Sequence, residues 1–198
     1  MSKLYEEQEF DYMTNAVKQR IAARLKKHTT NLRQEWETPP DFYDAVHAEF
    51  HPDLDVCANK TNTKHIRYFD LANGLDGLIE TWVASSREEP YDVLAAWCNP
   101  GFGNVWPWLK KAYEETQEND DRLPLPTALV LTHASLAADW WQWAIEHATE
   151  CRLLSPRIQF IAPKGIKQTS NPRDSALWVF RANKPKTQPC HIWQWRWK

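Results

Sequence analysis

Two short apolar runs with a helical pattern between them constrain the fold of this chain most strongly. Residues 91–98 and 127–132 have the length and composition of buried strands, and residues 104–118 between them have helical spacing. Strands and helices alternate in this way up to residue 155, which predicts a mostly parallel sheet covered by helices. The length of 198 residues suits one such α/β domain with an added terminal segment.

Strands dominate after residue 155, and this change predicts an antiparallel edge at the C-terminal end of the sheet. The last predicted strand alternates with period two, which places Trp193, Trp195 and Trp197 on one face. Thr38 is the expected N-cap of the first helix of the domain. The remaining predicted elements are helices at 38–50, 74–83 and 135–148, and strands at 51–58, 151–155, 157–161, 176–181 and 191–197.

Residues 1–34 are predicted to form a helical extension of the domain, which itself spans residues 35–198. Apolar side chains recur at helical spacings as far as Leu25. The following Lys26-Lys27-His28 cluster suits a helix C-terminus. This cluster is a minor candidate for a contact with nucleic acid, and a solvated surface is the alternative.

The charge balance excludes a large positive electrostatic field that would attract nucleic acid to the whole protein. The net charge is -2, so any contact with nucleic acid has to come from a local basic patch. No stretch approaches the roughly 20 apolar residues of a membrane span. The first turns of the chain are charged and lack the apolar core of a signal peptide. We therefore expect a cytoplasmic protein with no membrane contact.

Neither the cysteines nor the histidines suggest a metal site. His47 and His51 are four residues apart, but no third ligand follows at a useful spacing. The four cysteines form no CxxC pair, so a zinc site or a disulfide framework is not expected; they are Cys57, Cys98, Cys151 and Cys190. Cys57 and Cys98 end apolar runs and are expected to be buried thiols in a reducing cytosol.

Polar residues stand at the ends of two predicted strands. Asp55 lies near the end of the strand at 51–58, and the tetrapeptide Asn99-Pro100-Gly101-Phe102 follows the strand at 91–98. Ligands of open α/β sheets bind beyond the carboxyl ends of the strands, so both positions are candidate site residues. A simple strand-ending turn is the alternative for the tetrapeptide, and a turn-capping carboxylate is the alternative for Asp55.

The tetrapeptide has the chemistry needed to act on the exocyclic amine of a nucleobase. The nitrogen lone pair is delocalised into the ring, and two acceptors that hold the amine hydrogens free it for attack. The Asn99 side-chain oxygen and the Pro100 carbonyl oxygen are two such acceptors, and Phe102 can stack on the base. Asn99 would position and polarise the amine and would not act as a general base, since an amide is a poor proton acceptor. A base in a duplex has to be flipped out to reach such a loop.

Five short motifs and a single tryptophan, Trp82, follow one another in a recognisable order. They are Glu35-Trp36-Glu37-Thr38-Pro39-Pro40, Leu54-Asp55-Val56-Cys57-Ala58, Asp76-Gly77-Leu78, Trp97-Cys98-Asn99-Pro100 and Ser155-Pro156-Arg157-Ile158-Gln159-Phe160. Together they resemble the phage and prophage DNA N6-adenine methyltransferase family over roughly residues 35–181. No single piece is specific, and the resemblance depends on their order and spacing.

The resemblance implies a Rossmann-like methyltransferase fold, S-adenosylmethionine as the donor and adenine in double-stranded DNA as the acceptor. It implies a phage or prophage protein in a bacterial host cell that protects DNA from restriction or alters its regulation. Asn99, Pro100 and Phe102 would hold the target amine. The donor-binding positions that it implies are Thr38, Pro39, Asp55, Cys57, Ala58, Asp76 and Leu78.

Position 101 departs from the family pattern, which reads Asp/Asn-Pro-Pro-aromatic. Gly101 gives the loop more freedom to lose on ordering, typically about 1 kcal/mol. A glycine turn after Asp55 is also missing. These departures motivate an alternative, a methyltransferase-like protein that binds nucleic acid or a host protein without turnover. A third interpretation moves the methyl group to cytosine N4, because the same loop serves both bases.

The segment at 162–173 is polar and basic and lies between two predicted strands. Lys164, Lys167 and Arg173 are candidates for contact with DNA phosphates, and a mobile surface hairpin is the alternative. Arg157 matches a family arginine and is a further DNA-binding candidate. The sequence leaves no room for a large separate recognition domain and does not reveal the oligomeric state.

Overall fold

The protein is described from a computed structural model that covers residues 36–83, 93–117, 124–184 and 188–196, with helical pieces at 19–20 and 22–23. The predicted extension at 1–34 and Trp197 otherwise lie outside the described residues, so the division of the chain at residue 34 stays a prediction. Among the described residues, no helix is long and apolar enough to cross a bilayer.

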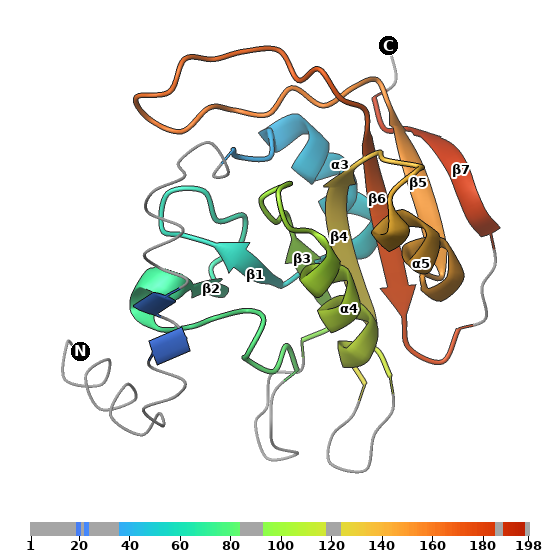
Figure 1. Ribbon diagram of the computed structural model, residues 1–198, viewed down its shortest axis with the longest axis horizontal. Helices are drawn as coiled ribbons and strands as arrows, with labels where there is room; N and C mark the ends of the chain where they lie inside the picture. Colours follow the sequence, from blue (N-terminus) through green and yellow to red (C-terminus); the bar gives the residue numbers. More distant parts are fainter. Residues whose placement is uncertain are drawn as a thin grey trace.

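The described strands form one seven-stranded sheet in the order β2-β1-β3-β4-β6-β5-β7 (Figure 1). The strands are β1 (Leu54–Ala58), β2 (Tyr68–Asp70), β3 (Ala95–Cys98), β4 (Thr127–His133), β5 (Glu150–Ser155), β6 (Ser175–Arg181) and β7 (Gln188–Gln194). The helices are α3 (Pro40–Phe50), η2 (Leu71–Asn73, a 3-10 helix), α4 (Trp106–Glu115) and α5 (Asp139–His147).

The mostly parallel sheet that the sequence predicts is confirmed. Strand β1 pairs in parallel with β2 and β3, β3 pairs in parallel with β4, and β5 pairs in parallel with β7. Strand β6 runs antiparallel to both of its neighbours, β4 and β5. The antiparallel pairing therefore lies in the C-terminal part of the sheet, as expected, but one detail is corrected. The antiparallel strand is internal, because β7 crosses to the far side of β5 and forms the edge there.

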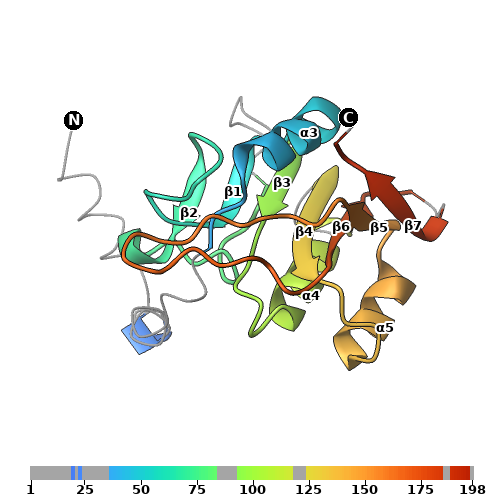
Figure 2. The ribbon, with the colours of Figure 1, turned by 90° about the horizontal axis from the view of Figure 1, so that it is seen from above.

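Helices cover both faces of the sheet (Figure 2). Helix α3 packs Phe42, Val46 and Phe50 against one face, and α4 and α5 cover the other. The strands alternate accordingly: in β4, Leu129 belongs to the α3 side and Val130 to the α4 side. This two-sided burial explains why the central strands read as continuous apolar runs.

The C-terminal alternation of tryptophans is confirmed for the residues that the structure describes. The Trp195 ring lies edge-on to Phe42 with ring centroids 5.1 Å apart, and Trp193 lies 6.0 Å from the same ring. Ile192 between them is 67% exposed. Trp193 in β7 and Trp195 directly after it thus extend the α3 core to the edge of the sheet.

The predicted helix at 74–83 is wrong, because these residues form turns. Gly74 ends η2 with a φ of 84°, a left-handed conformation that glycine adopts without strain. The backbone at Gly77 then approaches β1 so closely that an added Cβ would lie 2.0 Å from the Val56 carbonyl oxygen. Trp82, which looked like the end of a helix, donates its indole N–H to the Gly77 carbonyl at 2.7 Å.

Two smaller expectations are also wrong. Helix α3 has Pro39 at its N-cap position and no side-chain cap, so Thr38 does not cap it. Residues 157–161 are extended but are not a strand of the sheet, and Ile161 forms only an isolated antiparallel bridge with Glu37. Their alternation comes from one-sided burial, in which Ile158 is 0% exposed while the residues beside it face solvent.

Candidate active site

The carboxyl ends of β1, β3, β4 and β5 meet at one edge of the sheet. The tetrapeptide Asn99-Pro100-Gly101-Phe102 follows β3 at this edge. The connection from β5 to β6, residues 156–174, runs along the same edge toward β2, and we call it the arm (Figures 1 and 2). The topology thus brings together the two segments that the sequence singled out separately.

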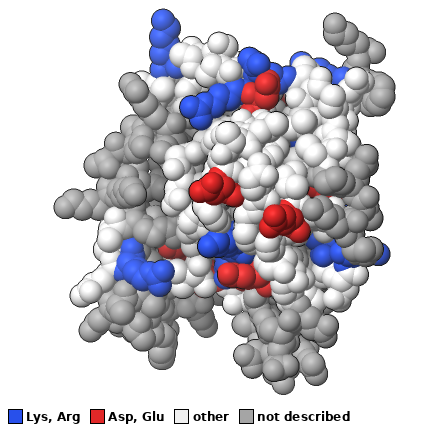
Figure 3. All heavy atoms as spheres, turned by 45° about the vertical axis from the view of Figure 1, so that its right-hand side comes forward, with Lys and Arg blue, Asp and Glu red and all other residues white. Residues whose placement is uncertain are grey.

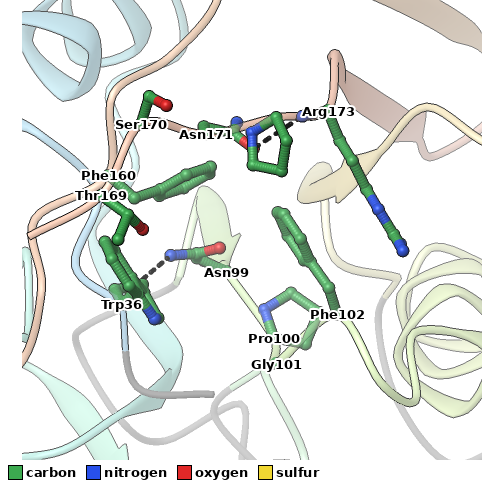
Figure 4. A pocket seen from close by; sticks show the side chains of 11 residues that line it. Trp36, Asn99, Pro100, Gly101, Phe102, Phe160, Thr169, Ser170, Asn171 and Arg173 are labelled. Carbon is green, nitrogen blue, oxygen red and sulfur yellow. Dashed lines mark hydrogen bonds between the residues drawn. The ribbon is translucent and has the colours of Figure 1, made fainter. Parts of the chain in front are cut away.

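A cavity of about 260 Å³ lies between the tetrapeptide and the arm (Figure 4). It opens to solvent and presents mainly aromatic and small polar groups. Its walls are Trp36, Asn99, Pro100, Gly101, Phe102, Phe160, Thr169, Ser170, Asn171, Pro172 and Arg173. Every residue of the tetrapeptide lines it, so the predicted amine-holding loop faces a concave site.

The Asn99 side chain is held in one orientation. Its Nδ2 donates to the Trp36 carbonyl oxygen at 3.2 Å and to the Thr38 hydroxyl at 3.0 Å. A carbonyl oxygen only accepts hydrogen bonds, so the amide nitrogen has to face Trp36. The oxygen Oδ1 therefore points away from Trp36 into the cavity (Figure 4), and no described residue donates to it.

Aromatic rings form the walls beside Asn99. The Phe102 ring lies edge-on to Phe160, with centroids 5.4 Å apart, and 5.3 Å from the His133 ring at the end of β4. Trp36 stands across the cavity from Phe102 (Figure 4). Such rings give a planar ligand surfaces to stack on. Burial, aided by Arg173, lowers the pKa of His133, so the ring that supports Phe102 is neutral at pH 7.

Asp55 is the second residue of β1 rather than a residue near its end, lies in register with Trp97 of β3, and is 2% exposed. Its Oδ1 accepts the Cys57 N–H at 3.3 Å and its Oδ2 accepts the Lys64 N–H at 3.0 Å. Burial raises the pKa of this carboxyl to about 6. Asp55 therefore organises the turn after β1, as the turn-capping alternative predicts, and it also places a carboxylate where the sequence predicts donor binding.

The other predicted donor residues lie around this turn rather than in the cavity. Cys57 and Ala58 are half-buried at the end of β1, with small side chains. Asp76 is 1% exposed and accepts the Leu78 N–H at 2.9 Å, in the turn that packs on β1. Thr38 is 2% exposed and touches Asn99 instead. The structure thus separates the cavity, which is the predicted base side, from the turn after β1, which is the predicted donor side, and it places Thr38 beside the cavity.

The arm has three exposed cationic side chains, Lys164, Lys167 and Arg173, that form no ion pair with any described residue. Arg157 differs, because it pairs with Asp174 at 2.8 Å and donates to the Asn171 carbonyl. Several basic side chains gather at the top of the molecule in Figure 3, where the arm lies in Figure 1. Arg157 therefore shapes the arm, and the three other cations are available to a partner.

Trp36 and Phe160 are site residues that sequence reasoning did not assign. Trp36 belongs to the motif around Thr38 but had no role, and Phe160 was placed in a predicted strand. Both reach the cavity through contacts that are distant in sequence, since Asn99 and Trp36 are 63 residues apart. The only sequence signal for them is that each is an aromatic residue inside one of the five motifs.

The sequence matches the family described as DNA N-6-adenine-methyltransferase (Dam) over residues 26–192. No curated protein matches the sequence. Among solved structures, the type I restriction-modification system methyltransferase subunit from Streptococcus thermophilus is similar at a TM-score of 0.37 and 10% identity. That similarity covers 76% of this chain and 45% of the subunit, and it is too low to carry an argument.

Proposed function

The chain belongs to the DNA N-6-adenine-methyltransferase (Dam) family, and we propose that it methylates adenine N6 in double-stranded DNA with S-adenosylmethionine as donor. The observation that carries this proposal is the orientation of Asn99. Its amide nitrogen is engaged by Trp36 and Thr38, and its oxygen faces an aromatic-lined cavity. An acceptor fixed at the bottom of such a cavity suits the amine of a flipped base.

The residues of the tetrapeptide have separate roles in holding the amine and the base. Asn99 Oδ1 and the Pro100 carbonyl oxygen each accept one N6 hydrogen, which withdraws the nitrogen lone pair from the ring. Phe102, supported by His133 and Phe160, stacks on the base and fixes its plane. When bound, S-adenosylmethionine would supply an electrophilic methyl group, and its sulfur would keep the electron pair of the S–C bond that breaks and leave as a neutral thioether. As the new N–C bond forms, the extra amine proton leaves along one of the two hydrogen bonds toward water, because neither acceptor retains it.

The residues around β1 fit a cationic donor. S-adenosylmethionine carries a positive sulfonium and a positive ammonium, and Asp55 and Asp76 bring two carboxylates to the turns on this side. Cys57 and Ala58 are small enough to let a ligand approach the backbone. We assign donor binding to these four residues, together with Pro39 and Leu78.

Gly101 leaves this assignment chemically intact. The two acceptors and the aromatic ring stand on either side of it, and Gly101 does not adopt a positive φ. Gly101 gives the loop more conformational entropy to lose when the loop becomes ordered, a cost in free energy on the order of 1 kcal/mol. The expected cost is a rate reduced several-fold relative to a proline at this position, and turnover is retained.

We expect DNA from bacteria that express the protein to contain N6-methyladenine, and DNA from cells that express Asn99→Ala to contain none. Nucleoside mass spectrometry measures both at once. N4-methylcytosine in place of N6-methyladenine would move the activity to the other base. No modified base, with donor binding intact by calorimetry, would favour a protein that binds DNA or a host protein without turnover.

The three unpaired cations of the arm are proposed to contact DNA phosphates. Replacing Lys164, Lys167 and Arg173 together by alanine should weaken duplex binding and reduce the slope of log affinity against log salt by up to about three, about one per lost phosphate contact. Fluorescence anisotropy with a duplex over a salt series measures the slope. Lys184→Ala, an exposed lysine at the other end of β6, is the control. An unchanged slope in the triple variant would remove the arm from the DNA interface.

The setting of the activity is part of the same proposal. We place it in the cytoplasm of a bacterial host, where modification of phage or prophage DNA blocks restriction or alters regulation. Digestion of DNA from expressing cells with a panel of adenine-sensitive restriction enzymes tests this. Protection that is lost in Asn99→Ala supports a protective role and reports the recognition sequence.

A further inference from the structure

Thr38 occupies a position that neither helix capping nor donor binding explains. It is 2% exposed, it makes no cap to α3, and its hydroxyl oxygen accepts a hydrogen bond from Asn99 Nδ2 at 3.0 Å. Trp36, two residues earlier, accepts the second amide hydrogen through its carbonyl at 3.2 Å. Both hydrogens of the Asn99 amide are therefore taken by the short segment 36–38.

This pairing makes the alternative orientation of the amide unfavourable. If the Asn99 side chain flipped, Oδ1 would face the Trp36 carbonyl oxygen, and two acceptors would oppose each other. The cavity would then receive two N–H donors in place of the acceptor that an adenine amine requires. The Thr38 hydroxyl can donate as well as accept, so the Trp36 carbonyl sets the direction of the amide and Thr38 adds a second hydrogen bond that holds it there.

Segment 36–38 is itself held from two sides. The Glu37 N–H donates to the Ile161 carbonyl at 2.9 Å, and the Ile161 N–H donates back to the Glu37 carbonyl at 2.9 Å. The Glu37 carboxylate pairs with Lys64 at 2.6 Å, and the Lys64 N–H donates to Asp55. The segment therefore connects the arm and the donor-side turn to the residue that faces the base.

We propose that Thr38 is a positioning residue, whose hydroxyl holds the Asn99 amide in the orientation that the Trp36 carbonyl selects, with the amide oxygen toward the target amine. This inference rests on the proposed function and reassigns Thr38 from donor binding to the base side. Thr38 acts through Asn99, so it need not touch either substrate. Its removal should therefore slow the methylation step without weakening the donor.

The kinetic test compares Thr38→Val with Thr38→Ser. Valine keeps the volume and removes the acceptor, whereas serine keeps the acceptor. We expect Thr38→Val to lower kcat about 10-fold while KM and Kd for S-adenosylmethionine stay within about two-fold, and Thr38→Ser to restore kcat. A Kd for the donor raised 10-fold or more in Thr38→Val, with kcat unchanged, would return Thr38 to the donor site and overturn the proposal.

A second readout does not require turnover. In the wild-type protein without substrates, the side-chain NH₂ signals of Asn99 can be assigned by their loss in Asn99→Ala. We expect Thr38→Val to shift these signals and speed their hydrogen exchange, and Thr38→Ser to leave them near their wild-type positions. Unmoved signals in Thr38→Val contradict the proposal even if the protein methylates DNA. Moved signals support it even if no methylation is found, and Thr38→Ala serves in both assays if the valine variant does not fold.

Discussion

Replacing Asn99 by alanine is expected to reduce DNA methylation at least about 100-fold while the affinity for S-adenosylmethionine changes by less than about two-fold. The alanine removes Oδ1, the acceptor that faces the cavity, and oriented groups of this kind typically contribute a factor of 10²–10³ to the rate. The donor-side turn at Asp55 is separate from the cavity, so it is left intact. Radiolabelled methyl transfer to duplex DNA and calorimetry with the donor measure the two quantities.

The matched control for this variant is Asn104→Ala. Asn104 is an exposed asparagine five residues further along the chain, and its side chain makes no hydrogen bond with the described residues. We expect it to keep full activity. A loss of donor affinity in Asn99→Ala that equals the loss in an Asp55 variant would contradict the division of the site into a base side and a donor side.

The fold and the position of the tetrapeptide follow from local sequence patterns. Buried strands such as β4 read as apolar runs because helices cover both faces, and α4 shows its buried stripe at Trp108, Ala112 and Glu115. Asn99-Pro100 marks a strand end because proline cannot continue the ladder. The rule that ligands bind beyond the strand ends then predicts where the loop lies.

The walls and supports of the site could not be predicted in this way. The partners of Asn99 lie 61 and 63 residues earlier in the chain, and the Glu37–Ile161 bridge is a further contact between distant segments. Local periodicity contains no signal for such pairs. The same limit explains why the sequence predicts a strand at 157–161, since burial on one side produces alternation whether or not neighbouring strands are hydrogen-bonded.

Asp55 shows how one residue can satisfy two interpretations of its sequence context. A carboxylate near a strand end predicts either a turn cap or a ligand contact, and the geometry supports the first directly. The second depends on charge, because a buried group whose pKa is about 6 changes its charge inside the range where enzymes of this kind can be assayed. The pH dependence of the two properties should therefore separate the roles.

We expect the free energy of unfolding and the donor affinity to respond to pH in opposite directions through Asp55. Burial raises its folded-state pKa from 3.8 to about 6, so the folded protein binds this proton more tightly than the unfolded chain does. The stability contributed by Asp55 is fully present below pH 4 and falls by about 3 kcal/mol as pH rises through 6. The ionised form that appears over the same interval is the one that attracts a cationic donor, so donor affinity should rise as stability falls.

Asp55→Ala removes both trends and provides the test. It leaves the Cys57 and Lys64 N–H groups without their acceptor, a cost of about 1–3 kcal/mol each, but it also removes the buried charge. The variant should therefore be destabilised most at pH 4–5 and least above pH 7, where the two effects nearly cancel. Urea unfolding and donor calorimetry between pH 4.5 and 8 measure both curves. A wild-type donor affinity that does not change with pH, beside a stability curve that does, would restrict Asp55 to its role in the turn, because only a charge that the donor senses can link the two.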